Sequence, residues 1–490
     1  MNPLELQQSI QSRRQFLNRA GMGLGAAVLG SLFSKKSLAA GSTLSHIAPK
    51  AKRVIFIFMA GAPSQLDLFD YKPDLYKKYK EPLPSEVRAG QRVTAMTQGK
   101  SHLIAPSLFK FSQQGGSGIW MSELLPHLST VADDLCFIRS MHTNAINHDP
   151  GKTLICTGSE IPGKPSLGAW LSYGLGTLNK DLPDFIVLNS AFWSGDQRNV
   201  QALYSRLWGT GFLPSKHQGV MFQPSGDPVL FLSNPAGVTR TSRHKMLDLV
   251  TELNNKHAAE IGDPEIQTTI AQQEMAFRIQ ASVPELTDLT SEPEHILDLY
   301  GPEVRKSGSF ARNCLLARRM AERNVRFVQL YHRGWDHHVG LPPKLRAQCY
   351  DIDQAASALI KDLKQRGLLE TTLVVCGGEF GRTVYCQGKQ SETDYGRDHH
   401  PRCFTAWLAG GGIKGGIVHG QTDEYSYNIV DQDGQKTTRF EDDAVHVHDL
   451  NATILHQLGV DHRYLTFPFQ GLDQKLTGVE EAHVVTKILS

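Results

Sequence analysis

Nearly continuous apolar runs alternate along the chain with segments that are apolar on one side only. The runs contain few polar residues, which is typical of strands buried on both faces of a sheet. Six of them stand out: Arg53–Met59, Leu135–Arg139, Phe185–Leu188, Val325–Tyr331, Thr371–Cys376 and Phe404–Ala409. We predict a strand for each run.

Helical periodicity fills several of the intervals between these runs. Ile352, Ala355, Ala356, Leu359, Ile360 and Leu363 share one face of a helix, and residues 311–324 form another candidate. Strands that alternate with helices predict a three-layer α/β/α sandwich around a mostly parallel central sheet. The more polar middle, about residues 200–300, has a helical stretch from 244 to about 280. We interpret this middle part as a helical insertion that caps the site.

Composition narrows the function classes. The chain has 490 residues, is 40% hydrophobic and has a net charge of +2, so it can form a large core. Beyond residue 40 the net charge is −2, which gives no electrostatic reason to expect nucleic-acid binding. Seven cysteines are scattered without a Cys-x-x-Cys pair, which argues against an iron–sulfur cluster. Histidine is frequent, with 20 copies, and favours metal or acid–base chemistry.

The N-terminus resembles a twin-arginine (Tat) export signal. Arg13-Arg14-Gln15-Phe16-Leu17 precedes a weakly apolar run, Ala20–Phe33, and small residues follow up to Ala40. Fourteen apolar residues are fewer than the roughly 20 that span a bilayer, although a short membrane anchor is the alternative. We therefore predict a signal peptide over residues 1–40, the Tat translocon as a partner and no stable membrane span in the mature form. Residues 41–490 are then one periplasmic or secreted domain.

Acidic and histidine residues gather where three predicted strands end or begin. Asp336, His337 and His338 follow the strand at 325–331, and Glu379 and Arg382 follow the strand at 371–376. Gly396-Arg397-Asp398-His399-His400 stands just before the strand at 404–409. Active sites of open α/β sheets lie beyond the carboxyl ends of the strands, so we expect these clusters to share one site.

A fourth element, His148-Asp149-Pro150-Gly151, opens a predicted helix that could bind an anion at its N-terminus, or merely shapes a turn. The Gly-x-Gly-x-x-Gly within residues 410–416 is followed by a short strand pattern rather than a helix, so we interpret it as a turn. Neither a Gly-x-Ser-x-Gly elbow nor a Walker loop occurs, which disfavours a serine α/β-hydrolase and a P-loop enzyme.

Taken in order, these motifs resemble the DUF1501 family of exported bacterial proteins. The matching stretches are Phe58–Asp70, Gly334–His338, Gly378–Thr383, Gly396–His399, Trp407–Gly412 and His448–Gly459. That family is similar to the alkaline phosphatase and sulfatase superfamily. The resemblance implies an alkaline phosphatase-like sandwich with metals at the strand ends, and hydrolysis of phosphate or sulfate esters.

The resemblance also implies residue roles. Asp336 and His338 match a metal-binding pair, and His399 or its neighbour His400 matches the histidine that completes the site. Glu379 stands where the superfamily has an aspartate followed by a histidine, but here Phe380 follows and cannot ligate. Asp67 is the nearest replacement for an aspartate after the first strand.

The nucleophile departs most from the superfamily pattern. His148 occupies the place of the usual Ser or Thr, and no Cys-x-Pro-x-Arg sulfatase signature occurs. Thr153 and Ser64 are the only hydroxyl candidates nearby.

The leading hypothesis is an exported metal-dependent hydrolase whose substrate is an anionic ester, either a small molecule or a glycan. Metal-bound water would replace the missing Ser or Thr nucleophile. Its metal ligands are Asp336, His338, His399 or His400, Glu379 and Asp67, and its catalytic residues are His148, Glu379, Arg382 and Arg397. Zinc is the first choice of metal, with manganese or calcium as alternatives. A non-catalytic binding protein with a degenerate metal or anion site is the second hypothesis, and a redox metalloprotein the third. Trp335, Tyr395 and Phe380 are candidates for stacking on a sugar, although Trp335 fits the core equally well.

Overall fold

The computed structural model describes residues 46–490 except 89, 191–199, 224–236, 262–278 and 280–281. The predicted signal peptide and the end of the predicted helix at 244–280 lie outside the described residues. Within the described part, no helix combines the length and apolar character needed to cross a bilayer.

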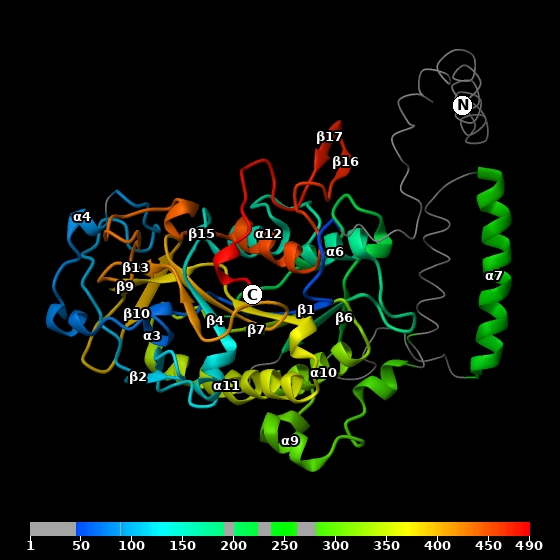
Figure 1. Ribbon diagram of the computed structural model, residues 1–490, viewed down its shortest axis with the longest axis horizontal. Coiled ribbons are helices and arrows are strands. Elements are labelled where there is room, and N and C mark those ends of the chain that lie inside the picture. The colour runs from blue at the N-terminus through cyan, green and yellow to red at the C-terminus, as the bar shows by residue number, and fades with distance from the viewer. Residues whose placement is uncertain (1–45, 89, 191–199, 224–236, 262–278, 280–281) are drawn as a thin grey trace. The chain divides into compact units, whose positions relative to one another are not determined.

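A mixed, mostly parallel sheet forms the centre of the fold (Figure 1). Its described strands run in the order β12-β4-β11-β8-β1-β7-β5-β6, and β15 pairs with β4 at the same edge as β12. Among the described strands of this sheet, only β11 runs antiparallel to its neighbours. The strands are β1 (Arg53–Ala60), β4 (Leu135–His142), β5 (Phe185–Ser190), β6 (Val220–Phe222), β7 (Phe327–Arg333), β8 (Thr372–Gly377), β11 (Phe404–Ala409), β12 (Ile417–His419) and β15 (Val445–His446).

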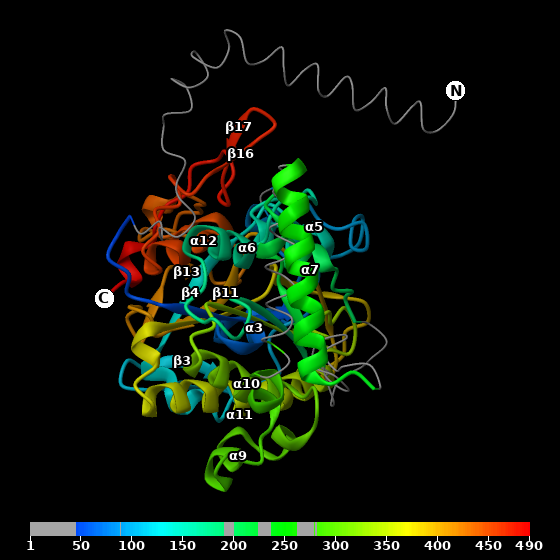
Figure 2. The ribbon, with the colours of Figure 1, turned by 90° about the vertical axis from the view of Figure 1, so that its right-hand side faces the viewer.

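Side chains of β1 alternate between two hydrophobic cores, one on each face of the sheet. Ile55, Ile57 and Met59 belong to the core that also contains residues of α10 (Phe310–Glu322) and α11 (Leu341–Gln365). Val54, Phe56 and Phe58 belong to the other core, with residues of α5 (His148–Thr157), α6 (Leu167–Leu175) and α12 (Val447–Gln457). Figure 2 shows these helices on opposite sides of the strands. The predicted three-layer sandwich is confirmed.

The six predicted strands all form. Each begins within two residues of its predicted first residue and ends within three residues of its predicted last residue. The region 200–300 is less uniform than predicted. It contributes β6 to the sheet as well as the helices α7 (Arg240–Ile261) and α9 (Glu294–Tyr300).

Smaller elements lie outside the central sheet. Short helices are α3 (Gln65–Leu68) and α4 (Ser85–Arg88). Two-stranded sheets are formed by β2 (Phe111–Gln114) with β3 (Ile119–Ser122), β9 (Gly381–Gln387) with β10 (Gly396–His400), β13 (Gln421–Thr422) with β14 (Ile429–Val430), and β16 (Phe467–Phe469) with β17 (Leu472–Gln474).

The glycine-rich segment 410–416 connects β11 to β12 as a turn, as predicted. Its glycines allow close backbone approach, since a Cβ atom on Gly410 would lie 2.3 Å from the Leu369 carbonyl oxygen.

All seven cysteines are buried and unpaired. Four belong to the core beside α10 and α11 (Cys314, Cys349, Cys376 and Cys386), and Cys136 and Cys156 belong to the opposite core. Burial raises the pKa of the Cys136 thiol to about 12, so almost none of it is thiolate at pH 7.

Candidate metal centre

The carboxyl ends of β1, β7 and β8 meet at one edge of the sheet, and the segments that follow carry the polar residues of the candidate centre. β7 leads to Asp336 and His338, and β8 leads to Glu379. His399 comes from β10, directly before β11, which begins at this edge because it runs antiparallel to β8. The N-terminus of α5, which follows β4, adds His148. The fold therefore brings together residues that are more than 200 positions apart.

Four residues present one ligand atom each to a common point. They are His148, Asp336, His338 and His399, whose ligand atoms all lie within 4.8 Å of one another. The Nε2 atoms of His338 and His148 lie 2.8 Å and 3.1 Å from Oδ1 of Asp336. The Nε2 atom of His399 lies 3.7 Å from the same oxygen and 3.1 Å from Nε2 of His338. Three imidazoles and one carboxylate are a donor set for a transition metal.

An oxygen atom holds the opposite ring nitrogen of each histidine. Nδ1 lies 2.6 Å from Glu379 Oε1 in His148, 2.7 Å from the Ile146 carbonyl oxygen in His399, and against the Gln387 amide oxygen in His338. Because these oxygens accept hydrogen bonds, each Nδ1 carries the proton and each Nε2 keeps a lone pair. The lone pairs of His338 and His399 repel each other at 3.1 Å unless a cation lies between them. The residues therefore fit a metal ion.

The electrostatics of the centre also favour a cation. Burial opposes ionisation of Asp336, but Arg382 and the three imidazoles hold its pKa well below the ordinary value. Burial lowers the pKa of His399 to about 4, so this ring is neutral at pH 7. Burial would also lower the pKa of His148, yet Asp336 and Glu379 raise it overall. Two carboxylates thus attract positive charge to the position of His148, either as a proton or as a metal ion.

Glu379 contacts His148 rather than the common point of the ligand atoms. Its side chain is fully buried, and its two oxygens accept hydrogen bonds from the Gly61 N–H at 2.9 Å and 3.2 Å. Gly61 has φ +115°, and a Cβ atom there would lie 2.6 Å from the Asp336 nitrogen. Only glycine therefore lets the chain pass from β1 beside Asp336 while donating to Glu379.

The guanidinium of Arg382 is bound by groups of the protein itself. Its guanidinium donates to the carbonyl oxygens of Gly61 and Ala62 and lies 2.7 Å from Oδ1 of Asp336. The side chain is only 1% exposed. Arg382, which the sequence analysis predicts to be a catalytic residue, thus holds Asp336 in place.

Arg397 and Asp67 pair with each other, away from the four clustered residues. Both side chains are 0% exposed, and Nε of Arg397 lies 2.7 Å from Oδ2 of Asp67. Ser64 and Tyr395 donate hydroxyl hydrogen bonds to the same carboxylate. The structure therefore does not bring Asp67 to the centre as a ligand. It gives Arg397 a partner within the protein.

His400 also lies apart from the centre. Its Nε2 lies 2.6 Å from the Tyr427 carbonyl oxygen, and its Nδ1 lies 3.3 Å from the Gln91 amide. Of the two adjacent histidines that the sequence analysis left open, the structure brings only His399 to the cluster.

The aromatic candidates are buried rather than available for stacking on a sugar. The ring centroid of Phe380 lies 5.0 Å from that of His148 and 4.6 Å from that of His399, so Phe380 is a wall behind two ligands. Trp335 is fully buried in the core and donates its indole N–H to His332. Tyr395 is occupied by Asp67.

Comparison of the sequence with known protein families identifies the family of the chain. Residues 51–489 match the family described as "Protein of unknown function (DUF1501)". The chain belongs to the DUF1501 family. The resemblance noted in the sequence is thereby confirmed over almost the whole of the described residues. No curated protein matches this DUF1501 chain.

Solved structures similar to the DUF1501 chain come from the alkaline phosphatase and sulfatase superfamily. Alkaline phosphatase from the Antarctic bacterium TAB5 has 10% identity and a TM-score of 0.29, covering 75% of this chain and 95% of its own. A phosphonate monoester hydrolase from Silicibacter pomeroyi has 17% identity and a TM-score of 0.30, with 68% of each chain covered. A sulfatase from Pseudoalteromonas sp. has 12% identity and a TM-score of 0.34, covering 93% and 75%. At these values no residue role passes from those proteins to this chain.

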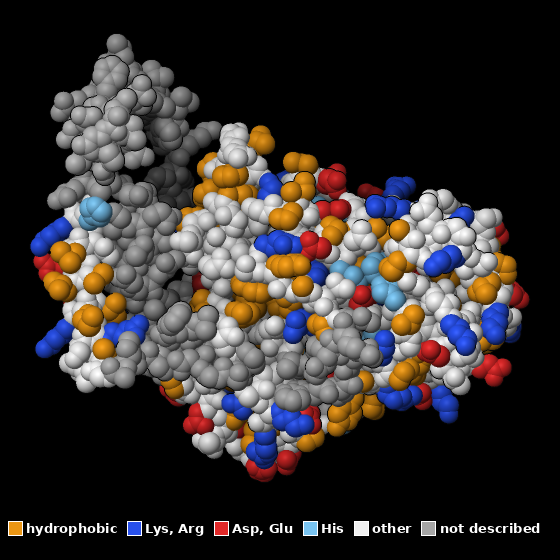
Figure 3. All heavy atoms as spheres, turned by 180° about the vertical axis from the view of Figure 1, so that it is seen from behind, with side chains coloured by type: hydrophobic (Ala, Val, Ile, Leu, Met, Phe, Trp, Pro, Cys, Tyr) orange, Lys and Arg blue, Asp and Glu red, His pale blue; other side chains and the backbone are white. Residues whose placement is uncertain are grey.

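Gln201 is a site residue that the sequence analysis missed. Its Nε2 atom donates a hydrogen bond of 2.8 Å to Oδ2 of Asp336. Gln201 lies outside every motif and far from any predicted strand end, so no local pattern could reveal it. Of the four clustered residues of the DUF1501 chain, His338 has the most exposed side chain, at 20%. Histidine side chains gather at one place on the face shown in Figure 3.

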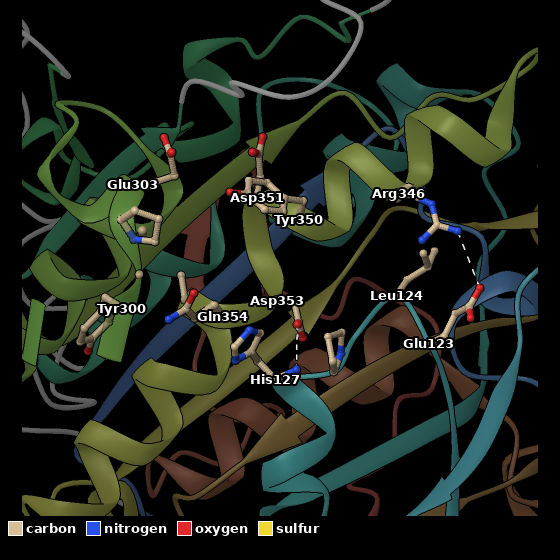
Figure 4. A pocket seen from close by; sticks show the side chains of 15 residues that line it. Glu123, Leu124, His127, Tyr300, Glu303, Arg346, Tyr350, Asp351, Asp353 and Gln354 are labelled. Atoms are coloured by element: carbon tan, nitrogen blue, oxygen red, sulfur yellow. Dashed lines mark hydrogen bonds and ion pairs between the residues drawn. The ribbon is translucent and has the colours of Figure 1, made fainter. Parts of the chain in front are cut away.

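A separate cavity of about 350 Å³ lies on the α11 side of the DUF1501 fold, and none of the four clustered residues lines it. Figure 4 shows its acidic side chains, several of which already have partners. Glu123 lies 3.7 Å from Arg346, and the Asp353 carboxylate accepts hydrogen bonds from two backbone N–H groups, of His127 and Leu128. We assign these contacts to the attachment of α11, not to chemistry.

Proposed function

We propose that this protein is an exported, metal-dependent hydrolase of an anionic ester of the phosphate or sulfate class. The observation that carries the proposal is the convergence of three imidazole Nε2 atoms on Oδ1 of Asp336, with every Nδ1 held by an oxygen. The motif resemblance to the phosphatase and sulfatase superfamily supports the reaction class, and the paired arginines of the N-terminus support export.

We propose zinc as the metal, with manganese as the alternative. Imidazole nitrogen suits zinc and other transition metals, whereas calcium takes oxygen ligands. Three of the four donors here are nitrogen atoms, so calcium, the third candidate from the sequence, fits this donor set poorly.

Four residues would bind the metal, and two others hold these ligands in position. His148, His338, His399 and Asp336 would hold the metal. When bound, the metal polarises the ester and lowers the pKa of a coordinated water. Glu379 keeps the Nδ1 proton on His148, and Arg382 keeps Asp336 ionised and fixed.

Lys152 is a further cation on the helix that supplies His148, and its side chain is also buried. It lies one turn after His148 on α5 and donates to the Ala202 carbonyl oxygen at 2.6 Å. Burial lowers the pKa of Lys152, while Glu379 and Asp149 oppose that shift. Arg382, Arg397 and Lys152 are thus all engaged within the protein, so the metal would supply most of the positive charge that neutralises the ester.

A metal-binding protein without catalysis is the second candidate. Four protein ligands can complete a tetrahedral zinc site, and a site closed in that way would be structural rather than catalytic. The engagement of both arginines and of Glu379 within the protein also favours this alternative.

The test begins with the metal content of the purified mature protein, measured by elemental mass spectrometry, and then a panel of phosphate monoesters, phosphate diesters and sulfate esters. We expect about one equivalent of metal and hydrolysis of one ester class, both lost in His338→Ala. His400→Gln is the matched control, because glutamine retains a donor and an acceptor for Tyr427 and Gln91. Metal without hydrolysis would favour the second candidate, and a protein that binds no metal would reject both.

A further inference from the structure

Both oxygens of Asp336 are in use, but for different purposes. Oδ1 faces the three imidazole Nε2 atoms and Arg382. Oδ2 accepts a hydrogen bond of 2.8 Å from the side-chain amide of Gln201. The carboxylate is therefore divided between one oxygen at the metal centre and one oxygen tied to a neutral donor.

Several contacts anchor the segment around Gln201 to the start of α5. The carbonyl oxygen of Ala202 accepts the 2.6 Å hydrogen bond from buried Lys152. Arg206 forms an ion pair with Asp149, and its guanidinium lies 4.3 Å from the ring centroid of Tyr204. The same helix turn that supplies His148 thus fixes the backbone from which Gln201 reaches Asp336.

A carboxylate can bind a metal through one oxygen or through both. If Oδ2 were free, rotation about the Cβ–Cγ bond would let it approach the metal as a second ligand atom. The Gln201 amide opposes that rotation, since it would lose its acceptor. With Asp336 bound through one oxygen, the metal would have four protein ligands and could accept a fifth from solution.

We propose that Gln201 is a positioning residue that restricts Asp336 to one-oxygen coordination and keeps a metal position open for an exogenous anion. This inference rests on the proposed function, because it requires that the four residues hold a metal. The expected exogenous ligand is a tetrahedral oxyanion, the product class of ester hydrolysis.

The experiment uses the full mature chain loaded with Co²⁺, whose visible absorption bands weaken as coordination number rises. Gln201→Met removes the donor with little change of volume, and Tyr204→Phe is the control in the same segment. The Tyr204 ring is 46% exposed, and the substitution retains its contact with Arg206. Thermal unfolding of the metal-free variants checks that each is folded. Inorganic phosphate is the probe anion, and chelator competition gives the metal affinity.

For the wild type we expect a Co²⁺ spectrum that changes on addition of phosphate. In Gln201→Met the bands should weaken, the response to phosphate should disappear and the metal affinity should fall about 10–100-fold, as for other residues that hydrogen-bond a metal ligand. Tyr204→Phe should behave like the wild type.

The outcomes separate this inference from the proposed function. A wild-type protein that takes up no Co²⁺, zinc or manganese would reject the proposed function and this inference with it. Metal uptake by the wild type, with an unchanged spectrum and phosphate response in Gln201→Met, would overturn the inference alone. Equal losses in Tyr204→Phe would also overturn it, because the effect would then belong to the segment and not to the amide.

Discussion

Replacing Arg397 by methionine should destabilise the fold without emptying the metal centre. Arg397 contacts Asp67 through two nitrogens, at 2.7 Å and 3.2 Å, and donates to the carbonyl oxygens of Thr383 and Val384. The variant leaves the Asp67 carboxylate buried with only hydroxyl donors. Removing one partner of a buried ion pair costs about 3–5 kcal/mol, which is a large part of the roughly 5–15 kcal/mol that stabilises a typical domain.

Urea unfolding under reducing conditions, followed by tryptophan fluorescence, measures this loss. The double variant Asp67→Asn/Arg397→Met removes both charges and should recover most of the stability. Chelator competition should give both proteins a metal affinity close to that of the wild type. A variant within about 0.5 kcal/mol of the wild type that nevertheless loses hydrolysis would refute this reasoning. It would restore Arg397 as a substrate-binding residue.

Three further predictions concern metal affinity, pH and thiol reactivity. Glu379→Gln should weaken metal binding about 10–100-fold, less than His338→Ala, when the three proteins are compared by chelator competition. Burial raises the pKa of Asp67, but Arg397 and three hydroxyl and guanidinium hydrogen bonds lower it overall. Its stabilising contribution is therefore complete above the ordinary carboxyl pKa of about 3.9 and is lost only as the pH falls through the lower folded value. The stability difference between the wild type and Asp67→Asn should consequently be the same in urea unfolding at pH 7 and pH 5. Native protein should show almost no reaction with Ellman's reagent, and unfolded protein should show seven thiols, because all seven cysteines are buried; rapid reaction of native protein would contradict the burial.

The strands and the edge that carries the centre were predictable because they depend on local signals. An uninterrupted apolar run such as Thr371–Cys376 is readable from the sequence alone, and so is the glutamate that follows it. Parallel strands then impose the meeting of their carboxyl ends, which explains why Asp336 and Glu379 could be expected together before any contact was known. His399 precedes its strand, and it reaches the same edge only because β11 runs antiparallel to β8.

The partners of the charged residues were not predictable in this way. Asp67 and Arg397 are 330 positions apart, and nothing near either residue distinguishes a metal ligand from half of a buried ion pair. The assignment of Gln201 depends on another long-range contact, with Asp336, which is 135 positions away. Residue types predicted a site at this edge, whereas the role of each residue depended on which side chains the packing pairs with one another.

The seven buried thiols have a consequence for how the chain must be made and handled. A native molecule presents no thiolate to an oxidant, so its integrity does not depend on the redox potential of its surroundings. An unfolded molecule exposes all seven at once, and random disulfides would then trap it. If the chain is exported as proposed, folding before it reaches an oxidising compartment would shelter these thiols. In air, unfolding should therefore become irreversible. The stability of the protein is then kinetic, and the rate of unfolding determines how long the native state lasts.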